Sequence, residues 1–271
     1  MSDLQNSESG FSLRTFGAFN VVGLKTFALK EVKRFLAVYT QTLVAPVITM
    51  VLFYAVFSLA LGGAEREVVG IPFMDFVAPG LIVMAMAQNA FANTSSSMVI
   101  AKVQGNIVDI LMPPLSALEI FAGYILGAVA RGLLIGLIGY VALFTLTGLG
   151  VHSILSLVVF GFLGSMMLGT MGLIGGIWAD KFDHIAAVTN FIITPLTFLS
   201  GTFYPLKALP GFWYDLAHYN PFFYMINGFR FGATGITEAN IWGSIAILVG
   251  FNAFLSLIAL RMLAKGYKLK S

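Results

Sequence analysis

Six long apolar stretches limit the fold of this chain more than any other feature of its sequence. They cover residues 42–61, 73–97, 118–146, 154–179, 185–203 and 241–263, and polar or Pro- and Gly-containing segments separate them. About 20 helical residues, each rising ~1.5 Å, cross the ~30 Å hydrocarbon core of a bilayer. We therefore expect an all-α, polytopic membrane protein with six transmembrane helices, built from residues 42–263.

The shortage of charge supports this expectation. Charged residues make up 10% of the 271 residues and hydrophobic residues 58%. A soluble domain carries about 25% charged residues, because water must wet its surface. The sequence has no cysteine, which excludes disulfides, thiolate metal sites and thiol catalysis. The net charge of +3 is small and gives no support to a nucleic-acid-binding role.

Lysine and arginine concentrate at both ends of the chain. The basic residues before the first stretch are Arg14, Lys25, Lys30, Lys33 and Arg34, and those at or beyond the end of the last stretch are Arg261, Lys265, Lys268 and Lys270. Cytoplasmic segments of membrane proteins carry an excess of such residues. Because six crossings return the chain to its starting side, we predict two cytoplasmic termini, a tail over 1–23 and a basic tail over 264–271. The connections that contain Lys102 and Lys181 are expected on the same side.

Residues 24–41 are predicted to form an amphipathic helix. Leu24, Phe27, Ala28, Val32, Phe35, Leu36 and Tyr39 recur at helical spacing, and Thr26, Lys30, Lys33 and Arg34 occupy the opposite arc. Such a helix can lie in the cytoplasmic interface of the membrane, with its cations facing anionic lipid headgroups. The alternative is a helix exposed to the cytoplasm.

The connection over residues 98–116 contains a short predicted helix. Gly105 breaks the preceding helix, and Pro113-Pro114 cannot continue one, so we expect a helix over about 106–112. The polar and turn-forming residues of this loop are Lys102, Gln104, Gly105, Asn106, Asp109, Pro113 and Pro114. Two interpretations are open. The loop is an ordinary connector, or its helix docks a soluble partner.

Arg131 lies near the middle of the third apolar stretch, where an arginine is costly in lipid. It is therefore predicted to face other helices or a polar cavity. Gln88 and Asn89 lie at a similar depth in the second stretch and could receive the guanidinium. Gly123 and Gly127 share the face of Arg131 and would permit close helix approach. A buried polar tie between two helices and a direct substrate contact are both possible roles.

The segment 200–230 is rich in proline and aromatic residues and cannot be a continuous span. Aromatic residues suit the boundary between membrane and water, and so apolar a segment is expected to re-enter the outer leaflet as a hairpin between helices five and six. The candidate residues for an interfacial anchor or an outer gate are Ser200, Gly201, Phe203, Tyr204, Pro205, Pro210, Asn220, Pro221 and Arg230.

Enzyme motifs are missing from the sequence. It contains no G-x-S-x-G, no H-E-x-x-H and no Walker A motif. Asp180, Asp183 and His184 indicate a charged cytoplasmic turn rather than a metal site. We therefore expect no catalytic, cofactor or metal site in this chain.

Several segments resemble the type-2 ABC exporter permeases, in particular their YadH-like, multidrug-type branch. The matching segments are QTLVAPVITMVLF (41–53), FVAPGLIVM (76–84), GNIVDILMPPLS (105–116), GYILGAVARG (123–132), TPLTFLSGTFYPLKALP (194–210) and HYNPFFYMINGFRFG (218–232). The last two are the most specific, because hydrophobicity does not require their Pro, Gly and Asn spacing. The loop 98–116 departs from the family in carrying less charge.

The resemblance implies a six-helix permease protomer in a bacterial inner membrane, which forms a homodimer and pairs with two separate ATP-binding cassette subunits. ATP and Mg²⁺ would bind to those subunits. Segment 24–41 would be the connecting helix and loop 98–116 the coupling helix. The apolar, aromatic interior suits a hydrophobic or amphipathic substrate, whether drug-like, lipid or lipid-linked.

Two other classes of protein stay open on the residues alone. An ion-gradient-driven transporter usually has intramembrane carboxylates and repeated halves, whereas here Asp75 and Glu119 lie near the ends of stretches. A membrane scaffold that transports nothing is the third class.

Overall fold

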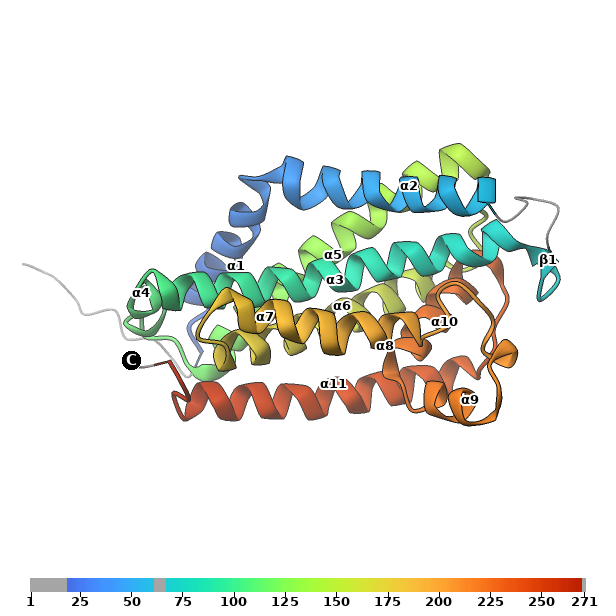
Figure 1. Ribbon diagram of the computed structural model, residues 1–271. Helices are drawn as coiled ribbons and strands as arrows, with labels where there is room; N and C mark the ends of the chain where they lie inside the picture. The colour runs from blue at the N-terminus through green and yellow to red at the C-terminus, as the bar shows by residue number, and fades with distance from the viewer. Residues whose placement is uncertain (1–18, 61–66, 270–271) are drawn as a thin grey trace, which may run out of the picture.

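The structure is a computed structural model that describes residues 19–60 and 67–269. Most of the predicted tail 1–23, including Arg14, lies outside the described residues, as does Lys270. The long helices are α1 (Val21–Leu36), α2 (Ala45–Ala60), α3 (Phe73–Val103), α5 (Ala117–Thr147), α6 (Ile154–Trp178) and α11 (Ile241–Ala264). In Figure 1, α2, α3, α6 and α11 run lengthwise through one elongated bundle, and α5 crosses behind α3.

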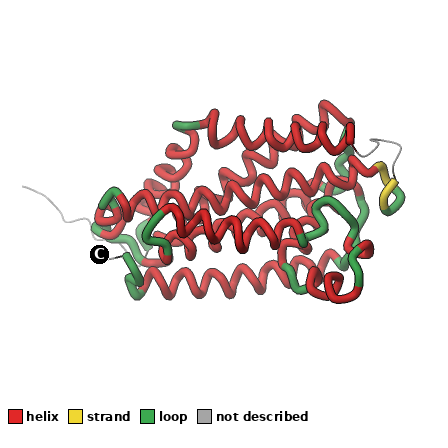
Figure 2. The backbone as a smooth tube through the Cα atoms, viewed as in Figure 1, coloured by secondary structure: helices red, strands yellow, loops and turns green. Residues whose placement is uncertain are grey.

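Shorter elements complete the chain. They are η1 (Thr40–Val44), β1 (Glu67–Val68), β2 (Ile71–Pro72), α4 (Ile107–Leu111), α7 (Phe182–Val188), η3 (Thr189–Ile193), α8 (Thr194–Phe198), η4 (Leu206–Ala208), α9 (Gly211–His218) and α10 (Pro221–Thr234). The two strands form one small antiparallel hairpin. Figure 2 shows that helix dominates and that loops gather at the two ends of the bundle. We call these the α4 end and the α9 end.

Five helices within residues 19–60 and 67–269 are long and apolar enough to cross a membrane. They are Thr40–Ala60, which joins η1 to α2, and α3, α5, α6 and α11. The all-α, polytopic architecture expected from the sequence is therefore confirmed. α3 is mostly buried, whereas only a small part of Thr40–Ala60 and of α11 is buried. Exposed apolar helix surface of this kind is suited to contact with lipid or with other membrane helices.

The fifth predicted stretch, 185–203, folds as α7, η3 and α8, which together reach from Phe182 to Phe198. The central piece is a π-helix. The helix ends before 203, and two hydroxyl groups that follow it bind one carbonyl oxygen of its last turn. Thr202 Oγ1 donates to Thr197 O at 3.2 Å, and Ser200 Oγ donates to the same oxygen. Gly201, at φ +73°, then turns the chain.

The fifth stretch nevertheless runs lengthwise along the bundle. Lys268, which follows α11, donates to the carbonyl oxygen of Trp178 at 3.1 Å, so α6 and α11 end together at the α4 end. Since α11 starts at the α9 end, the chain must travel from one end to the other between residues 178 and 241. The α7–η3–α8 segment makes this passage, as its gold ribbon in Figure 1 shows.

α3 lies at the centre of the core and packs against α5, α6 and α10. Its contact with α6 is close because α6 carries glycines. A Cβ on Gly176 would lie 3.1 Å from Ser95 O, and one on Gly172 would collide with Phe91 O. The backbone approach also allows Thr94 Oγ1 to donate to Gly169 O at 2.6 Å. Small residues thus set the spacing between these two helices.

Candidate functional site

The loop between α3 and α5 presents a short helix, α4, at one end of the bundle. α3 continues through Val103, so Lys102 belongs to its last turn and not, as the sequence suggested, to the loop. Gly105, at φ +76°, reverses the chain, and Asn106 precedes α4. Ile110 is buried, whereas Val108 is 50% exposed. The buried side chain of Ile110 therefore anchors α4 to the bundle, while other apolar side chains of α4 remain exposed.

The exit from this loop is tied to the start of α1. Ser116 and Glu119 form a capping box at the start of α5, in which one carboxylate oxygen accepts from Ser116 N at 2.6 Å. The other oxygen of Glu119 accepts from the backbone N–H of Asn20. Asn20 Nδ2 also donates to Pro114 O at 3.3 Å. A displacement of the segment after α4 therefore acts directly on the start of α1.

The predicted amphipathic helix 24–41 is present as α1, with corrected ends. It starts at Val21 and ends at Leu36, after which the chain bends into η1. The bend is stabilised by Thr42 Oγ1, which donates to Phe35 O at 2.6 Å. The apolar face packs against α5 rather than lying free, with the rings of Phe27 and Tyr124 in edge contact at 4.9 Å.

A buried charge on α1 was missed by the sequence analysis. Glu31 is 0% exposed, accepts from Ser97 Oγ at 2.8 Å and pairs with Arg34 at 3.3 Å. Arg34 in turn donates to Asn93 O at 2.7 Å. One signal was available, since Glu31 falls four residues from both Phe27 and Phe35, in the middle of the apolar arc.

Arg131 of α5 donates through Nη2 to Asn89 Oδ1 of α3 at 2.7 Å. Of the two proposed partners, the structure places Asn89 against Arg131 and turns Gln88 toward a cavity. Gly123 and Gly127, on the Arg131 face of α5, approach α1, because Cβ atoms there would meet Phe27 and Glu31. Close packing near Arg131 comes from Gly132, where a Cβ would collide with Ser165 of α6.

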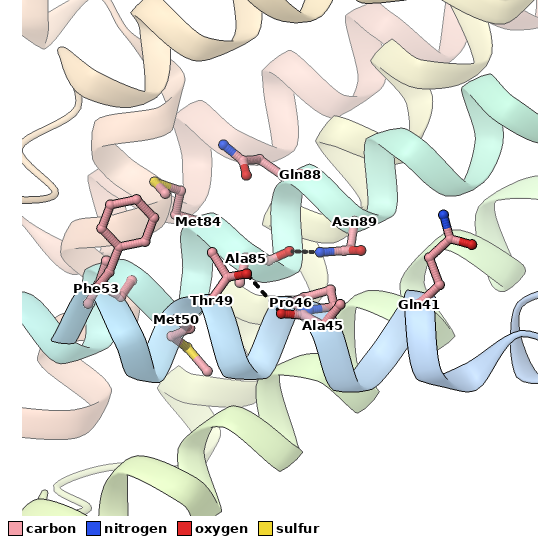
Figure 3. A pocket seen from close by; sticks show the side chains of 11 residues that line it. Gln41, Ala45, Pro46, Thr49, Met50, Phe53, Met84, Ala85, Gln88 and Asn89 are labelled. Atoms are coloured by element: carbon pink, nitrogen blue, oxygen red, sulfur yellow. Dashed lines mark hydrogen bonds between the residues drawn. The ribbon is translucent and has the colours of Figure 1, made fainter. Parts of the chain in front are cut away.

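A cavity of about 330 Å³ lies between α2 and α3. Figure 3 shows the lining side chains, which are Gln41, Ala45, Pro46, Thr49, Met50, Phe53, Leu81, Met84, Ala85, Gln88 and Asn89. The lining combines apolar groups with uncharged amides and one hydroxyl. Its polar groups can orient a ligand, and its apolar groups can bury hydrophobic surface. Asn89 connects the cavity wall to Arg131.

Arg230, in the outer segment predicted from the sequence, is 1% exposed and lies at the α9 end. It donates through Nη2 to Gly201 O at 2.7 Å and through Nε to Phe76 O at 3.0 Å. Its guanidinium also pairs with Glu238 at 3.6 Å. Burial raises the pKa of the Glu238 carboxyl, and the guanidinium acts in the opposite direction. Arg230 thus joins α10 to α3 and to two loops.

The other residues of the outer segment shape its short pieces. Asn220 caps α10 and donates through Nδ2 to Leu196 O at 2.7 Å, and Pro221 is the first residue of α10. Tyr204 donates to Phe198 O at 2.8 Å, and the ring of Phe203 contacts that of Phe57 at 5.0 Å. Pro205 and Pro210 precede η4 and α9, and Ser200 is buried beside Thr202. α9 is mostly exposed, whereas α10 is mostly buried.

The charged turn between α6 and α7 is an ion-paired site. Asp180 pairs with Lys268 at 2.9 Å and with Lys102 at 3.8 Å. The hydrogen bond from Lys268 holds the pKa of Asp180 below its usual range. No group of three or more His, Cys, Asp or Glu residues that could hold a metal ion occurs in 19–60 and 67–269.

The bundle, the amphipathic cavity and the displayed helix α4 together define a polytopic helical membrane protein with the features of a transporter. Comparison with known proteins identifies the family. Residues 23–233 match the family model described as ABC-2 type transporter. The chain is 39% identical over 250 residues to the inner membrane transport permease YadH of Escherichia coli strain K12, covering 92% of this chain and 98% of the relative.

A more distant match is the nodulation protein J of Sinorhizobium fredii. It is 24% identical over 171 residues, which cover 63% of this chain and 65% of that protein. The chain belongs to the ABC-2 type transporter family. The resemblance stated from the sequence motifs is thereby confirmed.

Proposed function

We propose that the chain is the membrane-spanning subunit of an ATP-driven exporter and that a separate ATP-binding subunit docks on α4. The observation that carries this proposal is the surface of α4. Val108, Leu111 and Met112 are exposed, Met112 to 78%. Asp109 is also exposed among them. Apolar groups displayed together at the end of a bundle, with a charge beside them, are typical of a protein–protein contact.

The proposed orientation places the α4 end in the cytoplasm, with six crossings and both termini on that side. The sixth crossing is α7–η3–α8, which runs lengthwise along the bundle although it is broken into three pieces. Helix α1, which carries Lys25, Lys30 and Lys33, and the residues Lys265 and Lys268 after α11 lie toward the α4 end, in keeping with the rule for cytoplasmic charge. The bacterial inner membrane is the proposed location, by analogy with the Escherichia coli relative.

The cavity between α2 and α3 supports a hydrophobic or amphipathic substrate. Its lining offers amides from Gln41, Gln88 and Asn89 but no charged side chain. A substrate with a large apolar part and a few hydrogen-bonding groups would match this lining. The cavity borders the exposed helix α2, so a second copy of the chain placed against α2 would enclose it. We propose such a homodimer, with the substrate path between the two copies.

The test of this proposal is association with the ATP-binding subunit. Asp109→Lys reverses the charge on α4, and Gly105→Pro is incompatible with φ +76° at the start of the helix. Both variants should insert into the membrane normally and lose co-purification of the ATP-binding subunit. Asp183→Lys reverses an exposed charge elsewhere at the same end and serves as the matched control. Normal association and ATP-dependent export in both α4 variants would show that the loop is a connector.

A further inference from the structure

Lys102 connects the end of α3 to the end of α6. Its Nζ donates to Ile177 O at 2.8 Å and to Ala179 O at 2.6 Å, and it lies 3.8 Å from the carboxylate of Asp180. These carbonyls belong to the last turn of α6, whose partial negative charge favours a cation. Lys102 is thus bonded both to the end of α6 and to the turn that leads into α7.

Lys268 fixes the same turn from the tail after α11. Its Nζ donates to Trp178 O at 3.1 Å and to Asp180 Oδ2 at 2.9 Å. Leu269, the next residue, is buried in the same apolar cluster as Ile110 of α4. The turn that contains Asp180 is therefore the meeting point of α3, α6 and the tail.

The helix that follows this turn is weakly held where it begins. None of the residues of α7, all of which the structure describes, is buried. Burial appears only further along, at Ile193 and Thr197. Behind the segment lies an apolar cavity of about 360 Å³, lined by Phe91, Met171, Ile174, Gly175, Trp178, Val188, Ile192 and Leu255. The π-helix η3 separates the loosely packed part from the packed part, and π-helical turns often mark sites of local adjustment.

We infer that Lys102 is a positioning residue that transmits a displacement of α4 to α7. Lys102 is separated from α4 only by residues 103–106. A push on α4 moves the end of α3, and Lys102 carries the turn at Asp180 with it. Because many residues of α6 are buried in the core and none of α7 is, the start of α7 moves, and the cavity behind it gives it room. This inference rests on the proposed docking of the ATP-binding subunit on α4.

The absence of cysteine from the sequence permits a direct test. Phe182→Cys places a reporter at an exposed position at the start of α7, and Val108→Cys places one on α4. Each variant is reconstituted with its ATP-binding subunit in lipid nanodiscs, and the rate of maleimide labelling is measured with and without ATP plus orthovanadate. A coupling between distant sites of ordinary strength should change the rate at position 182 by about fivefold or more.

In the Phe182→Cys background, Lys102→Met should bring the ratio of the labelling rates with and without nucleotide close to one. Lys102→Arg retains the charge and the donors and should preserve most of the change, which also controls for misfolding of the methionine variant. Lys181→Met removes a charge from the same turn. Lys181 has an exposed side chain that makes no hydrogen bond or ion pair with the described residues, so its removal should leave the ratio unchanged.

The two reporters separate the inference from the proposed function. If the cysteine at 108 is shielded by the ATP-binding subunit, and Lys102→Met still shows the full nucleotide response at 182, the role of Lys102 is wrong and docking on α4 stands. If the cysteine at 108 is not shielded, both docking on α4 and the transmission through Lys102 are wrong.

Discussion

The guanidinium of Arg230 lies 3.6 Å from the centre of the Phe76 ring and donates to the carbonyl oxygen of the same residue. The Arg230 side chain, on α10, thereby contacts the start of α3 in two ways, through the face of the Phe76 ring and through the Phe76 carbonyl oxygen. The same guanidinium also satisfies Gly201 O in the loop after α8. At the α9 end, the buried cation Arg230 therefore connects the elements. At the α4 end, Lys102 and Lys268 at the edge of the bundle do so.

Arg230→Met should destabilise the protein strongly. The substitution leaves Phe76 O, Gly201 O and the Glu238 carboxylate without their donor, and breaking a buried pair typically costs about 3–5 kcal/mol. Glu238→Gln should cost less, because burial already raises the pKa of that carboxyl and a neutral amide can still accept from Leu206 N. Thermal unfolding of the purified protein in detergent measures both effects.

Arg261→Met is the matched control for this prediction, since Arg261 is exposed on α11. Its unfolding temperature should equal that of the unmodified protein. An unchanged unfolding temperature in Arg230→Met would contradict the assignment of Arg230 as the residue that joins α10, α3 and the loops at the α9 end.

Arg131 and Asn89 should show a direct energetic coupling. If the 2.7 Å hydrogen bond between them stabilises the contact of α3 with α5, Arg131→Met and Asn89→Ala will not be additive. A double-mutant cycle on thermal unfolding should give an interaction of about 0.5–3 kcal/mol. Gln88→Ala, in the neighbouring position without this contact, should be additive with Arg131→Met. Additivity in both cycles would contradict a stabilising contact between Arg131 and Asn89 and would favour a role of Arg131 in substrate contact.

The helical spans could be predicted from the sequence because a helix that crosses the hydrocarbon core needs about 20 consecutive, mostly apolar residues. The predicted stretch 241–263 and the observed α11 differ by one residue at one end, since hydropathy, and not tertiary contact, sets these limits. The fifth stretch was predicted less well. Beyond its end at Phe198, the hydroxyls of Ser200 and Thr202 bind a carbonyl oxygen of its last turn, which hydropathy does not register.

The site residues could be predicted only in part. Arg131 was singled out because a charge inside a long apolar stretch is conspicuous, and so was its possible partner Asn89. Glu31 was overlooked because charge is ordinary on an amphipathic helix, and only its place on the apolar arc distinguishes it. Lys102 was assigned to a loop, since nothing in the sequence reveals that its amine reaches the carbonyls of Ile177 and Ala179, more than 70 residues further along.

Filling the cavity between α2 and α3 should block transport without unfolding the protein. Ala85→Trp introduces a large side chain into a space of about 330 Å³ that is open at the bundle surface. Export of a lipophilic fluorescent dye from proteoliposomes that contain the ATP-binding subunit should be lost, with thermal stability retained. Val249→Trp, on the exposed face of α11, should leave export intact. Normal export by Ala85→Trp would place the substrate path elsewhere.

The orientation of the chain can be tested with single cysteines in the cysteine-free sequence. Lys207→Cys lies in η4 at the α9 end, and Lys265→Cys follows α11 at the α4 end, and both positions are exposed. A membrane-impermeant maleimide applied to spheroplasts should label position 207, whereas position 265 should react only after the membrane is permeabilised. The reverse pattern would invert the proposed topology.

The most direct test of the account is whether an ATP-binding subunit covers α4. Cysteines are placed one at a time at Val108, on α4, and at Lys207, at the opposite end, and the rate of maleimide labelling in detergent is compared before and after the purified ATP-binding subunit is added. Our account predicts strong protection at position 108 and none at position 207. Equal labelling of position 108 with and without the bound subunit would contradict docking on α4.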